Sequence, residues 1–228
     1  MILKTDDLLD LKQTDYAVLF DEIEDIWEAI PKIKPFVADS VKGDKKGIIH
    51  PTAVVDDNVD IGTGTVVGPH AVIQGPTIIG ENCQIRVGAY IRGNVLIGDN
   101  VVIGNSTEIK NALLFNNVCV PHFNYVGDSI LGHKVHLGGG AVISNYKSDG
   151  SDIKTIIDKE TYNTGLRKFG AILGDNAEIG SSALLNPGTI IGRNSVVYAG
   201  AVVRGYIPSN HILKVRQEQE LVQKNKPA

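Results

Sequence analysis

An aliphatic residue recurs at every sixth position of this chain over eleven consecutive positions. The series begins at Ile49 and ends at Ile109, and every member is Ile or Val. Neither an α-helix, with about 3.6 residues per turn, nor a flat strand, with its alternation of two, produces that period. A residue of small or modest size follows each aliphatic by four positions: Ala53, Val59, Thr65, Ala71, Thr77, Cys83, Ala89, Val95, Val101, Thr107 and Leu113.

Each group of six residues therefore supplies two inward positions, which predicts a parallel β-helix. The chain makes a short strand, turns a corner and repeats, and three hexads close one triangular coil. Successive coils pair at the usual strand spacing of about 4.8 Å, so each coil is supported mainly by its neighbours. Glycine often follows the aliphatic, as at Gly62, Gly68 and Gly80, where it suits a corner. We expect an all-β prism with a core of stacked aliphatic side chains.

The repeat is interrupted twice. It stops after Phe115, resumes in a new register at Leu131, and resumes again at Leu173. We interpret residues 116–128 as a register shift. Residues 145–170 are polar, carry several cations and lack the repeat, so we expect a loop thrown out from a coil, and long loops on rigid scaffolds often carry function.

These interruptions and the ends of the repeat predict three parts. Residues 49–206 form the β-helix domain, including the 145–170 loop, and the polar segment 207–228 forms a tail or short helix. Residues 1–48 form a helical cap that packs on the first coil and covers its open strand edge. The cap is predicted from apolar residues at helical spacing and a proline that ends or kinks the helix: Phe20, Ile23, Trp27, Ile30 and Pro31.

Composition limits the functional class. The chain has 22 basic and 26 acidic residues and a formal net charge of −4, which argues against a broad nucleic-acid-binding surface. No apolar run approaches the roughly 20 residues of a membrane span, and aspartates occupy the N-terminus where a signal peptide would be apolar. Cys83 and Cys119 are both expected at inward positions, which fits a reducing compartment. We therefore expect a cytoplasmic protein.

Candidate catalytic side chains gather at the two interruptions. The segment PHFNYVGDSILG holds His122 and Tyr125, and Asn145 directly precedes the long loop. A histidine titrates near neutral pH and can act as a general base. From the residues alone, a surface histidine without a chemical role is the simpler explanation, and His122, His133 and His136 also raise a metal site as a hypothesis.

Several segments together resemble a known family. The stretches YIRGNVLIGDNVVIGNSTEIKNALL, PHFNYVGDSILG and VISNY resemble the acetyltransferase domain of the bifunctional glucosamine-1-phosphate acetyltransferase and N-acetylglucosamine-1-phosphate uridyltransferase. The stretch TGLRKFGAILGDNAEIGSSALLNPGTIIG is similar to archaeal sugar-1-phosphate nucleotidylyltransferases with an amino-sugar-phosphate acetyltransferase domain. Hexads alone are unspecific, but Arg92, Lys110, the His-x-x-Tyr pair and Asn145 in order are more specific. The resemblance covers about residues 49–216 and implies a left-handed β-helix.

The resemblance implies catalytic roles for His122 and Asn145. His122 matches the family's general base, which takes a proton from the 2-amine of the sugar as the amine attacks the acetyl thioester. Asn145 matches the residue that orients the amino sugar, and the backbone N–H of Tyr146 would help to stabilise the oxyanion. The implied substrate contacts are Arg92, Lys110, Tyr125, His136 and Lys154.

The same resemblance implies acetyl-CoA as co-substrate and no resident metal. Small residues would let the pantetheine approach the backbone, although simple corner packing explains them nearly as well. Lys154, Arg167 and Lys168 are further cations that could meet substrate or cofactor phosphates. The implied acetyl-CoA contacts are Gly139, Tyr146, Ser181, Ala199 and Arg216.

Two departures from the family pattern affect the predicted activity. His136 stands where the bacterial enzymes have a substrate-contacting Asn, which leaves the amino sugar open. Residues 1–48 are too few for a uridyltransferase domain, so we expect no nucleotidyltransferase activity.

The resulting prediction is a direct transfer of acetyl from acetyl-CoA to the amine of an amino-sugar phosphate such as glucosamine 1-phosphate, a step towards UDP-N-acetylglucosamine. The resemblance also implies a homotrimer with active sites between prisms. Two alternatives stay open, an acyltransferase on a nucleotide sugar or another amine, and a noncatalytic β-helix scaffold. We expect neither nucleic acid nor membrane as a partner.

Overall fold

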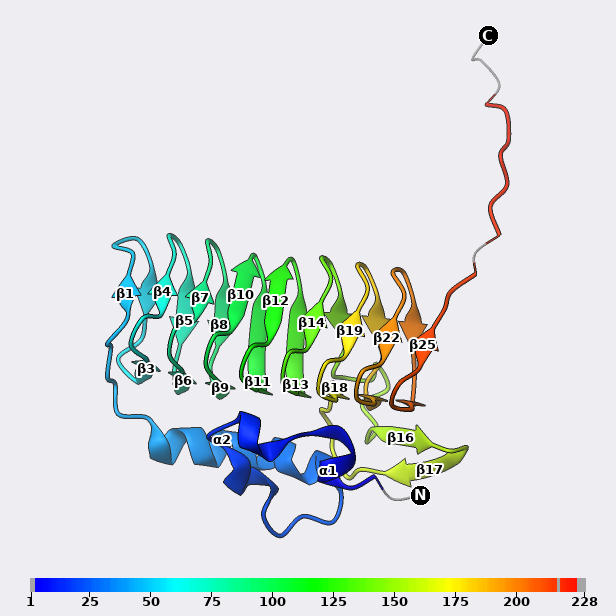
Figure 1. Cartoon of the computed structure of the whole chain (residues 1–228), viewed down its shortest axis with the longest axis horizontal. Coiled ribbons are helices and arrows are strands. Elements are labelled where there is room, and N and C mark those ends of the chain that lie inside the picture. The colour runs from blue at the N-terminus through cyan, green and yellow to red at the C-terminus, as the bar shows by residue number, and fades with distance from the viewer. Residues whose placement is uncertain (1–2, 217, 225–228) are drawn as a thin grey trace.

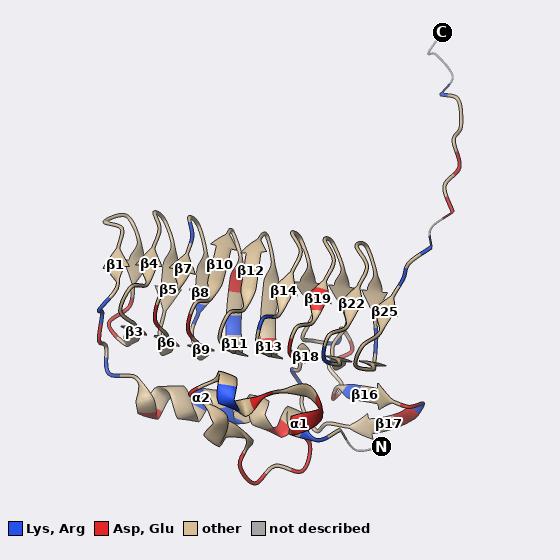
Figure 2. Ribbon diagram, viewed as in Figure 1, with Lys and Arg blue, Asp and Glu red and all other residues tan. Residues whose placement is uncertain are grey.

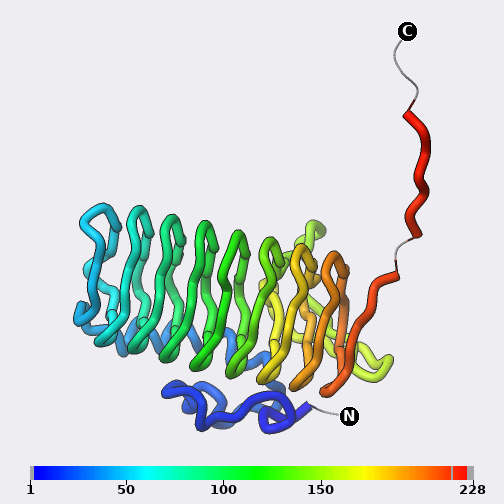
Figure 3. Tube along the Cα trace, turned by 45° about the horizontal axis from the view of Figure 1, so that its top comes forward, coloured from blue at the N-terminus to red at the C-terminus, as the bar shows by residue number. Residues whose placement is uncertain are grey.

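The computed structural model describes residues 3–216 and 218–224. Its main body is a prism of stacked parallel coils, with the N-terminal region along one side and the C-terminal segment extending from the far end (Figures 1 and 3). The parallel β-helix predicted from the hexad is confirmed, and the coils wind in the left-handed sense (Figure 1).

Three ladders of parallel strands form the faces of the prism. The first face contains β1 (Ile48–Ile49), β4 (Val66–Val67), β7 (Gln84–Ile85), β10 (Val102–Asn105), β12 (Cys119–His122), β14 (His136–Leu137), β19 (Glu178–Ile179), β22 (Val196–Val197) and β25 (Ile212–Leu213). The second contains β2 (Val54–Val55), β5 (Val72–Gln74), β8 (Tyr90–Arg92), β15 (Val142–Ile143), β20 (Leu184–Leu185), β23 (Val202–Val203) and the first halves of β11 (Glu108–Leu114) and β13 (Tyr125–Leu131). The third contains the second halves of β11 and β13 with β3 (Val59–Ile61), β6 (Thr77–Ile79), β9 (Val95–Ile97), β18 (Ala171–Leu173), β21 (Thr189–Ile191) and β24 (Tyr206–Ile207).

The hexad aliphatics stack inside the prism. Ile49 pairs with Val67, Val67 with Ile85 and Ile85 with Ile103, so each step advances by 18 residues along the chain. Cys83 is buried in this core, as expected. Cys119 is half-buried and faces outward, contrary to the prediction, because its neighbour Val120 occupies the inward position.

The segment interpreted as a register shift consists of coils that are one residue shorter. Ile103 pairs with Val120 and Ile109 with Val126, which are steps of 17 residues. The residue is lost at the corner between the second and third faces, so the strands continue where an irregular segment was expected. Leu113, predicted to be inward, instead faces outward and packs in the cluster formed with the N-terminal region.

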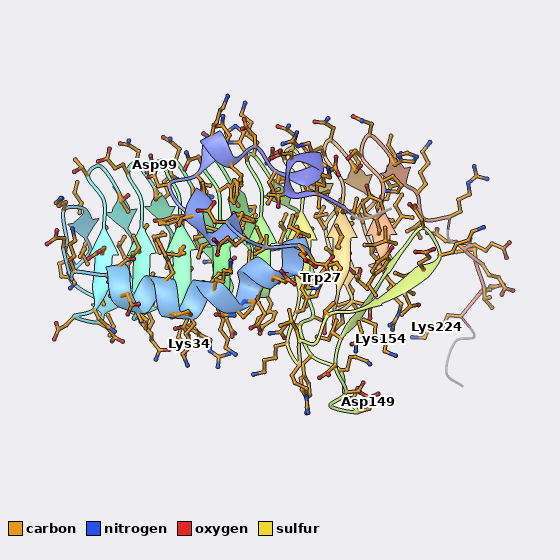
Figure 4. All side chains as sticks on the ribbon, turned by 90° about the horizontal axis from the view of Figure 1, so that it is seen from below. Trp27, Lys34, Asp99, Asp149, Lys154 and Lys224 are labelled. Atoms are coloured by element: carbon orange, nitrogen blue, oxygen red, sulfur yellow. The ribbon has the colours of Figure 1, made fainter. Side chains whose placement is uncertain are left out.

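The outward side of the third face is a row of aliphatic residues: Ile78, Leu96, Leu113, Ile130, Ile172 and Ile190. Helix α2 (Ala29–Ser40) lies along this face and buries Ile30, Ile33 and Val37 (Figures 1 and 4). It is preceded by α1 (Thr5–Leu8) and the 3₁₀ turns η1 (Leu11–Gln13), η2 (Ala17–Phe20) and η3 (Ile26–Glu28). The N-terminal region therefore covers one side of the prism.

The predicted N-terminal helix was wrong in its bounds and in its position. The apolar residues at helical spacing begin in η2, and α2 itself starts only at Ala29. Pro31 lies in the first turn of α2, where a missing N–H costs no helical hydrogen bond, so it does not end the helix. Helix α2 runs along the third face because that face presents the aliphatic row, and it does not cap the first coil.

The segments predicted as a loop (145–170) and as a tail or short helix (207–228) both contain strands. Residues 145–170 contain an antiparallel hairpin of β16 (Lys154–Ile157) and β17 (Glu160–Asn163), and the ring of Tyr162 lies 6.3 Å from that of Trp27. The prism continues past residue 206, because β25 pairs with β22. Residues 214–216 and 218–224 form no helix.

We expect Leu113→Ala to lower the free energy of unfolding by about 2–5 kcal/mol, because it removes a fully buried side chain between the prism and α2. Urea denaturation followed by circular dichroism measures the change. Leu221→Ala, at an exposed position in the tail, is the control and should change stability by less than about 0.5 kcal/mol. An equally small effect of Leu113→Ala would contradict the packing described here.

Candidate functional site

Four of the predicted site residues come together where the second face meets the third: Arg92, Lys110, Tyr125 and Asn145. Arg92 and Lys110 each follow a paired position, Ile91 and Ile109, by one residue, so they are neighbours on adjacent coils. Lys110 is in turn paired with Gly127 on the next coil. In Figure 2 blue ribbon segments on β8 and β11 lie toward the side of the prism that α2 covers. The ladder thus gathers residues that are 17 or 18 positions apart in the sequence.

Arg92 already has an anionic partner. Its Nη1 lies 2.7 Å from Glu108 Oε1, and this bond is the main reason that the pKa of Arg92 is raised. The guanidinium also lies 5.9 Å from the centroid of the Tyr90 ring. Arg92 can therefore bind a ligand anion only by sharing or exchanging Glu108.

Gly127 makes room for two polar side chains. A Cβ at this position would lie 2.7 Å from both the Tyr125 hydroxyl oxygen and the Asn145 Nδ2, so the absence of a side chain lets both groups converge there. Burial, with Glu108 and Asp128 nearby, raises the pKa of Tyr125. Its hydroxyl therefore stays protonated at neutral pH and can donate a hydrogen bond to a ligand.

Asp128 is a buried carboxylate at this corner that the sequence analysis missed. Its φ of +48° lies in the left-handed region, which Asp and Asn adopt more readily than most residues. Its Oδ1 accepts a hydrogen bond of 2.8 Å from Asn111 Nδ2, and its Oδ2 accepts one from Asn145 Nδ2. Because Nδ2 of Asn145 is engaged, the side-chain oxygen Oδ1 of Asn145 is the group left to accept a hydrogen bond from a ligand.

A cavity of about 550 Å³ opens beside Lys110 and Asp128. Burial lowers the pKa of Lys110, the charge of Asp128 opposes that shift, and the cations of Lys168 and Arg92 add to it. Three parts of the chain form the walls, namely α2, the prism corner and the end of the long loop: Ile30, Pro31, Lys34, Asn94, Lys110, Asn111, Asp128, Gly165, Leu166, Arg167 and Lys168.

The long loop brings Lys168 to this cavity and leaves Lys154 outside it. Lys154 is the first residue of β16, is exposed and does not line the cavity. Figure 4 shows it on the hairpin, well separated from Lys34 on α2. Lys168, which interacts with Lys110, and Arg167 are therefore the loop cations at this cavity, and Lys154 is not.

The predicted base, His122, lies at a different corner, between the first and second faces. It is the last residue of β12 and its side chain is exposed. The backbone carbonyl of His122 accepts a hydrogen bond of 3.0 Å from the N–H of Gly140 on the following coil. In the same way Gly139 accepts from Ser182, and Ser181 accepts from Gly200, each at 2.9 Å. These bonds align His122 with Gly139, Ser181 and Ala199 along one edge. A Cβ on Gly139 would lie 3.7 Å from His122 Cβ, an ordinary contact, so this edge is uncrowded.

Asn124 holds the His122 corner from inside the prism and was also missed. Its Oδ1 accepts from the His122 N–H at 3.1 Å, and its Nδ2 donates to the carbonyls of Gly138 and Ala141 at 2.8 and 3.2 Å. Phe123 between them is exposed and has a φ of +51°, which is unusual for a bulky residue. The available signal was an amide at an inward position where other coils have Ala or Thr.

The remaining predicted residues lie elsewhere. His136 is on the outward side of the first face, with Nδ1 3.6 Å from Glu178 Oε2. Tyr146 is exposed and lines a second cavity of about 440 Å³ with Lys147 and Arg204. Arg216 is exposed beyond β25. One prism therefore carries the predicted residues in two corner groups and several separate positions.

Within residues 3–216 and 218–224, no group of three or more His, Cys, Asp or Glu side chains is arranged to hold a metal ion, and His122, His133 and His136 form no such group. None of the helices in that part of the chain is long and apolar enough to cross a membrane.

Two family models match the chain. The GMPPB C-terminal domain matches residues 73–164, which include Lys110, His122 and Asn145, and the six-repeat bacterial transferase hexapeptide family matches residues 170–205. Fold and repeats together define a hexapeptide-repeat β-helix protein.

Curated relatives make the assignment more specific. The "Bifunctional protein GlmU" of Methanocaldococcus jannaschii is 34% identical over 192 residues, which are 84% of this chain and 47% of the relative. The GlmU of Methanococcus vannielii is 34% identical over 123 residues, 54% of this chain and 30% of the relative. The bifunctional sugar-1-phosphate nucleotidylyltransferase/acetyltransferase of Sulfurisphaera tokodaii is 33% identical over 113 residues, 50% and 28%.

The chain is thus similar to the GlmU and sugar-1-phosphate nucleotidylyltransferase/acetyltransferase proteins over their acetyltransferase-like region, and it spans less than half the length of these proteins. Solved structures similar to it include the UDP-N-acetylglucosamine O-acyltransferase LpxA of Moraxella catarrhalis (20% identity, TM-score 0.39, 66% of this chain and 65% of that one). Another is the acetyltransferase domain of PglB from Neisseria gonorrhoeae in complex with acetyl coenzyme A (20%, TM-score 0.30, 73% and 53%).

We expect Lys110→Gln to leave the free energy of unfolding at neutral pH unchanged or slightly higher. The pKa of Lys110 is lowered in the folded protein, so its charged form costs stability. That cost is fully present below the lowered pKa and disappears as pH rises through the ordinary lysine value of about 10.4. Urea denaturation at neutral and alkaline pH measures the difference, with the exposed Lys154→Gln as control. A clear loss of stability in Lys110→Gln at neutral pH would contradict this prediction.

Proposed function

We propose that the protein is an acetyl-CoA-dependent N-acetyltransferase acting in the cytoplasm on the amine of an amino-sugar phosphate such as glucosamine 1-phosphate. The observation that carries this proposal is the convergence of Lys110, Tyr125 and Asn145 around Gly127, next to a cationic cavity. The similarity to GlmU and sugar-1-phosphate acetyltransferase proteins supports the same acceptor class.

Acceptor binding follows from the charges at this corner. The ammonium groups of Lys110 and Lys168 attract the phosphate dianion, and Arg92 adds a donor when Glu108 shares it. The side-chain oxygen Oδ1 of Asn145 accepts a hydrogen bond from the sugar amine. The Tyr125 hydroxyl donates to a sugar or phosphate oxygen. This arrangement holds the anionic end and the nucleophilic amine of one small molecule.

His122 is the proposed general base. Because His122 and Asn145 lie at different corners of one prism, the base and the residue that orients the amine would meet between neighbouring prisms of the proposed trimer. His122 removes a proton from the amine as the nitrogen attacks the carbonyl carbon of the acetyl thioester, and the C–S bond then breaks to release CoA. The backbone N–H of Tyr146 donates no hydrogen bond to any residue that the structure describes, and it can bind the oxyanion of the tetrahedral intermediate. The acetyl group passes directly between the substrates, without a covalent enzyme intermediate.

Acetyl-CoA is proposed to lie along the edge that carries His122. Gly139, Ser181 and Ala199 continue this edge on later coils and leave the backbone accessible to a narrow chain such as pantetheine. Arg216, beyond β25, is the cation proposed to meet a CoA phosphate. The edge thus directs the thioester towards His122.

A homotrimer would complete the site. His136 lies on the first face, so it can reach the residues around Gly127 only in a neighbouring prism. Both faces that α2 leaves uncovered expose aliphatic residues, such as Ile48, Val66 and Ile212 on the first and Val54 and Val202 on the second. Packing the first face of one prism against the second face of the next would bury both rows and close a ring of three.

We expect the purified protein to release CoA from acetyl-CoA when glucosamine 1-phosphate or a closely related amino-sugar phosphate is added. A thiol-reactive dye follows CoA, and mass spectrometry identifies the N-acetylated product. Transfer only to nucleotide sugars would favour the alternative acceptor class, and no transfer to any hexosamine phosphate would refute the assignment. Failure of every acyl donor to bind would favour a noncatalytic scaffold.

We expect His122→Ala to lower kcat by roughly 10²- to 10⁴-fold, the usual contribution of a positioned general base, while urea stability changes little because the side chain is exposed. His136→Asn is the matched control and should change KM or acceptor preference more than kcat. Full turnover in His122→Ala would remove His122 from the mechanism.

A further inference from the structure

The cavity beside Lys110 holds more positive charge than the protein neutralises. Lys34, Lys110, Arg167 and Lys168 line it, and Asp128 is the one carboxylate among the lining residues. The ion pairs in the described part of the chain are Arg92 with Glu108, His136 with Glu178 and Arg193 with Asp175, and none includes any of the four cations. Gathering cations without a counter-charge is unfavourable, and an anionic ligand would reverse that cost.

Asp128 does not supply the missing charge pairing. Both of its carboxylate oxygens accept hydrogen bonds from amides, one from Asn111 and one from Asn145. No lysine or arginine nitrogen lies within ion-pair distance of it in the residues described. The amides fix the carboxylate in the wall, and the four cations have no ion-pair partner among the described residues.

The N-terminal region fixes one of these cations in place. Helix α2 packs on the prism through Ile30, Ile33 and Val37, which are almost completely buried. Lys34 lies on the same helix (Figure 4), but its side chain is exposed and lines the cavity. The end of the long loop also lines the cavity, and there Phe169 is buried and follows Arg167 and Lys168. Two anchored segments therefore each contribute cations to the cavity beside the prism corner.

We propose that this cavity is a phosphate-binding subsite formed jointly by α2 and the prism, in which Lys34 and Arg167 bind the phosphoryl group together with Lys110 and Lys168. The chemistry is that of a phosphate dianion, with a guanidinium that binds two oxygens and ammonium groups that act as point charges. The proposal rests on the proposed function only in naming the phosphoryl group as that of the acceptor. Lys34 and Arg167 then determine the preference for phosphorylated over unphosphorylated amino sugars.

Isothermal titration calorimetry of the full chain with inorganic phosphate at low ionic strength tests the subsite without any assay of activity. Wild-type protein is expected to bind phosphate, and Lys34→Gln and Arg167→Gln are each expected to weaken binding by about tenfold, as for the loss of one charge-assisted hydrogen bond. Lys32→Gln is the matched control on the same helix. Lys32 lies outside the cavity and donates to the Asp21 carbonyl at 2.6 Å, so its removal should change phosphate affinity by less than about twofold.

Acetyl-transfer kinetics with glucosamine 1-phosphate and with glucosamine separate the two proposals. Lys34→Gln should raise KM for the phosphorylated acceptor by about tenfold, with kcat and the KM for acetyl-CoA little changed and no effect on glucosamine. Phosphate binding that depends on Lys34 and Arg167, without acetyl transfer in any variant, would keep the subsite and refute the proposed function. Absence of phosphate binding by wild-type protein, or equal binding by Lys34→Gln and wild type, would overturn the subsite even if acetyl transfer occurs.

Discussion

Stacking of aliphatic side chains between parallel coils is the interaction on which the rest of this structure depends. It uses only the inward positions of each hexad, so the corners and outward rows are free to carry other residues. Because the coils repeat at strand spacing, residues 17 or 18 positions apart become neighbours. Lys110 is thus paired with Gly127 on the next coil, and His122 is aligned with Gly139 in the same way. A periodic core converts sequence spacing directly into the geometry of a binding edge.

The third face shows how the same scaffold recruits a second element. Its outward row is aliphatic, and α2 with its preceding turns buries most of that row. This packing stabilises the fold. It also fixes one wall of the cationic cavity, since Ile30, Pro31 and Lys34 line that cavity. The other two faces keep exposed aliphatic residues at positions such as Ile48 and Val202. Helical cover on one side and a free surface on two sides agree with the proposed trimer.

The period predicted the prism, because the prism depends only on residue spacing. Arg92 and Lys110 were named together through the family resemblance, and the ladder makes them neighbours. The period did not predict that the coils between Ile109 and Ile143 are one residue shorter, since a corner can lose a residue without disturbing the aliphatic stack. Nor did it select Lys168 over Lys154, because the hairpin breaks the link between sequence position and location. Asp128 and Asn124 read as ordinary corner or inward residues, and their importance lies in hydrogen bonds to distant residues such as Asn111 and Gly138.

The central claim is that an amino-sugar phosphate binds where the second face meets the third. A crystal structure of the protein with glucosamine 1-phosphate and CoA tests it most directly. The phosphate oxygens should lie about 3 Å from the ammonium groups of Lys110 and Lys168. The amine should lie at a similar distance from the side-chain oxygen Oδ1 of Asn145. Sugar phosphate bound at another surface, with this cavity empty at saturating ligand, would contradict the account.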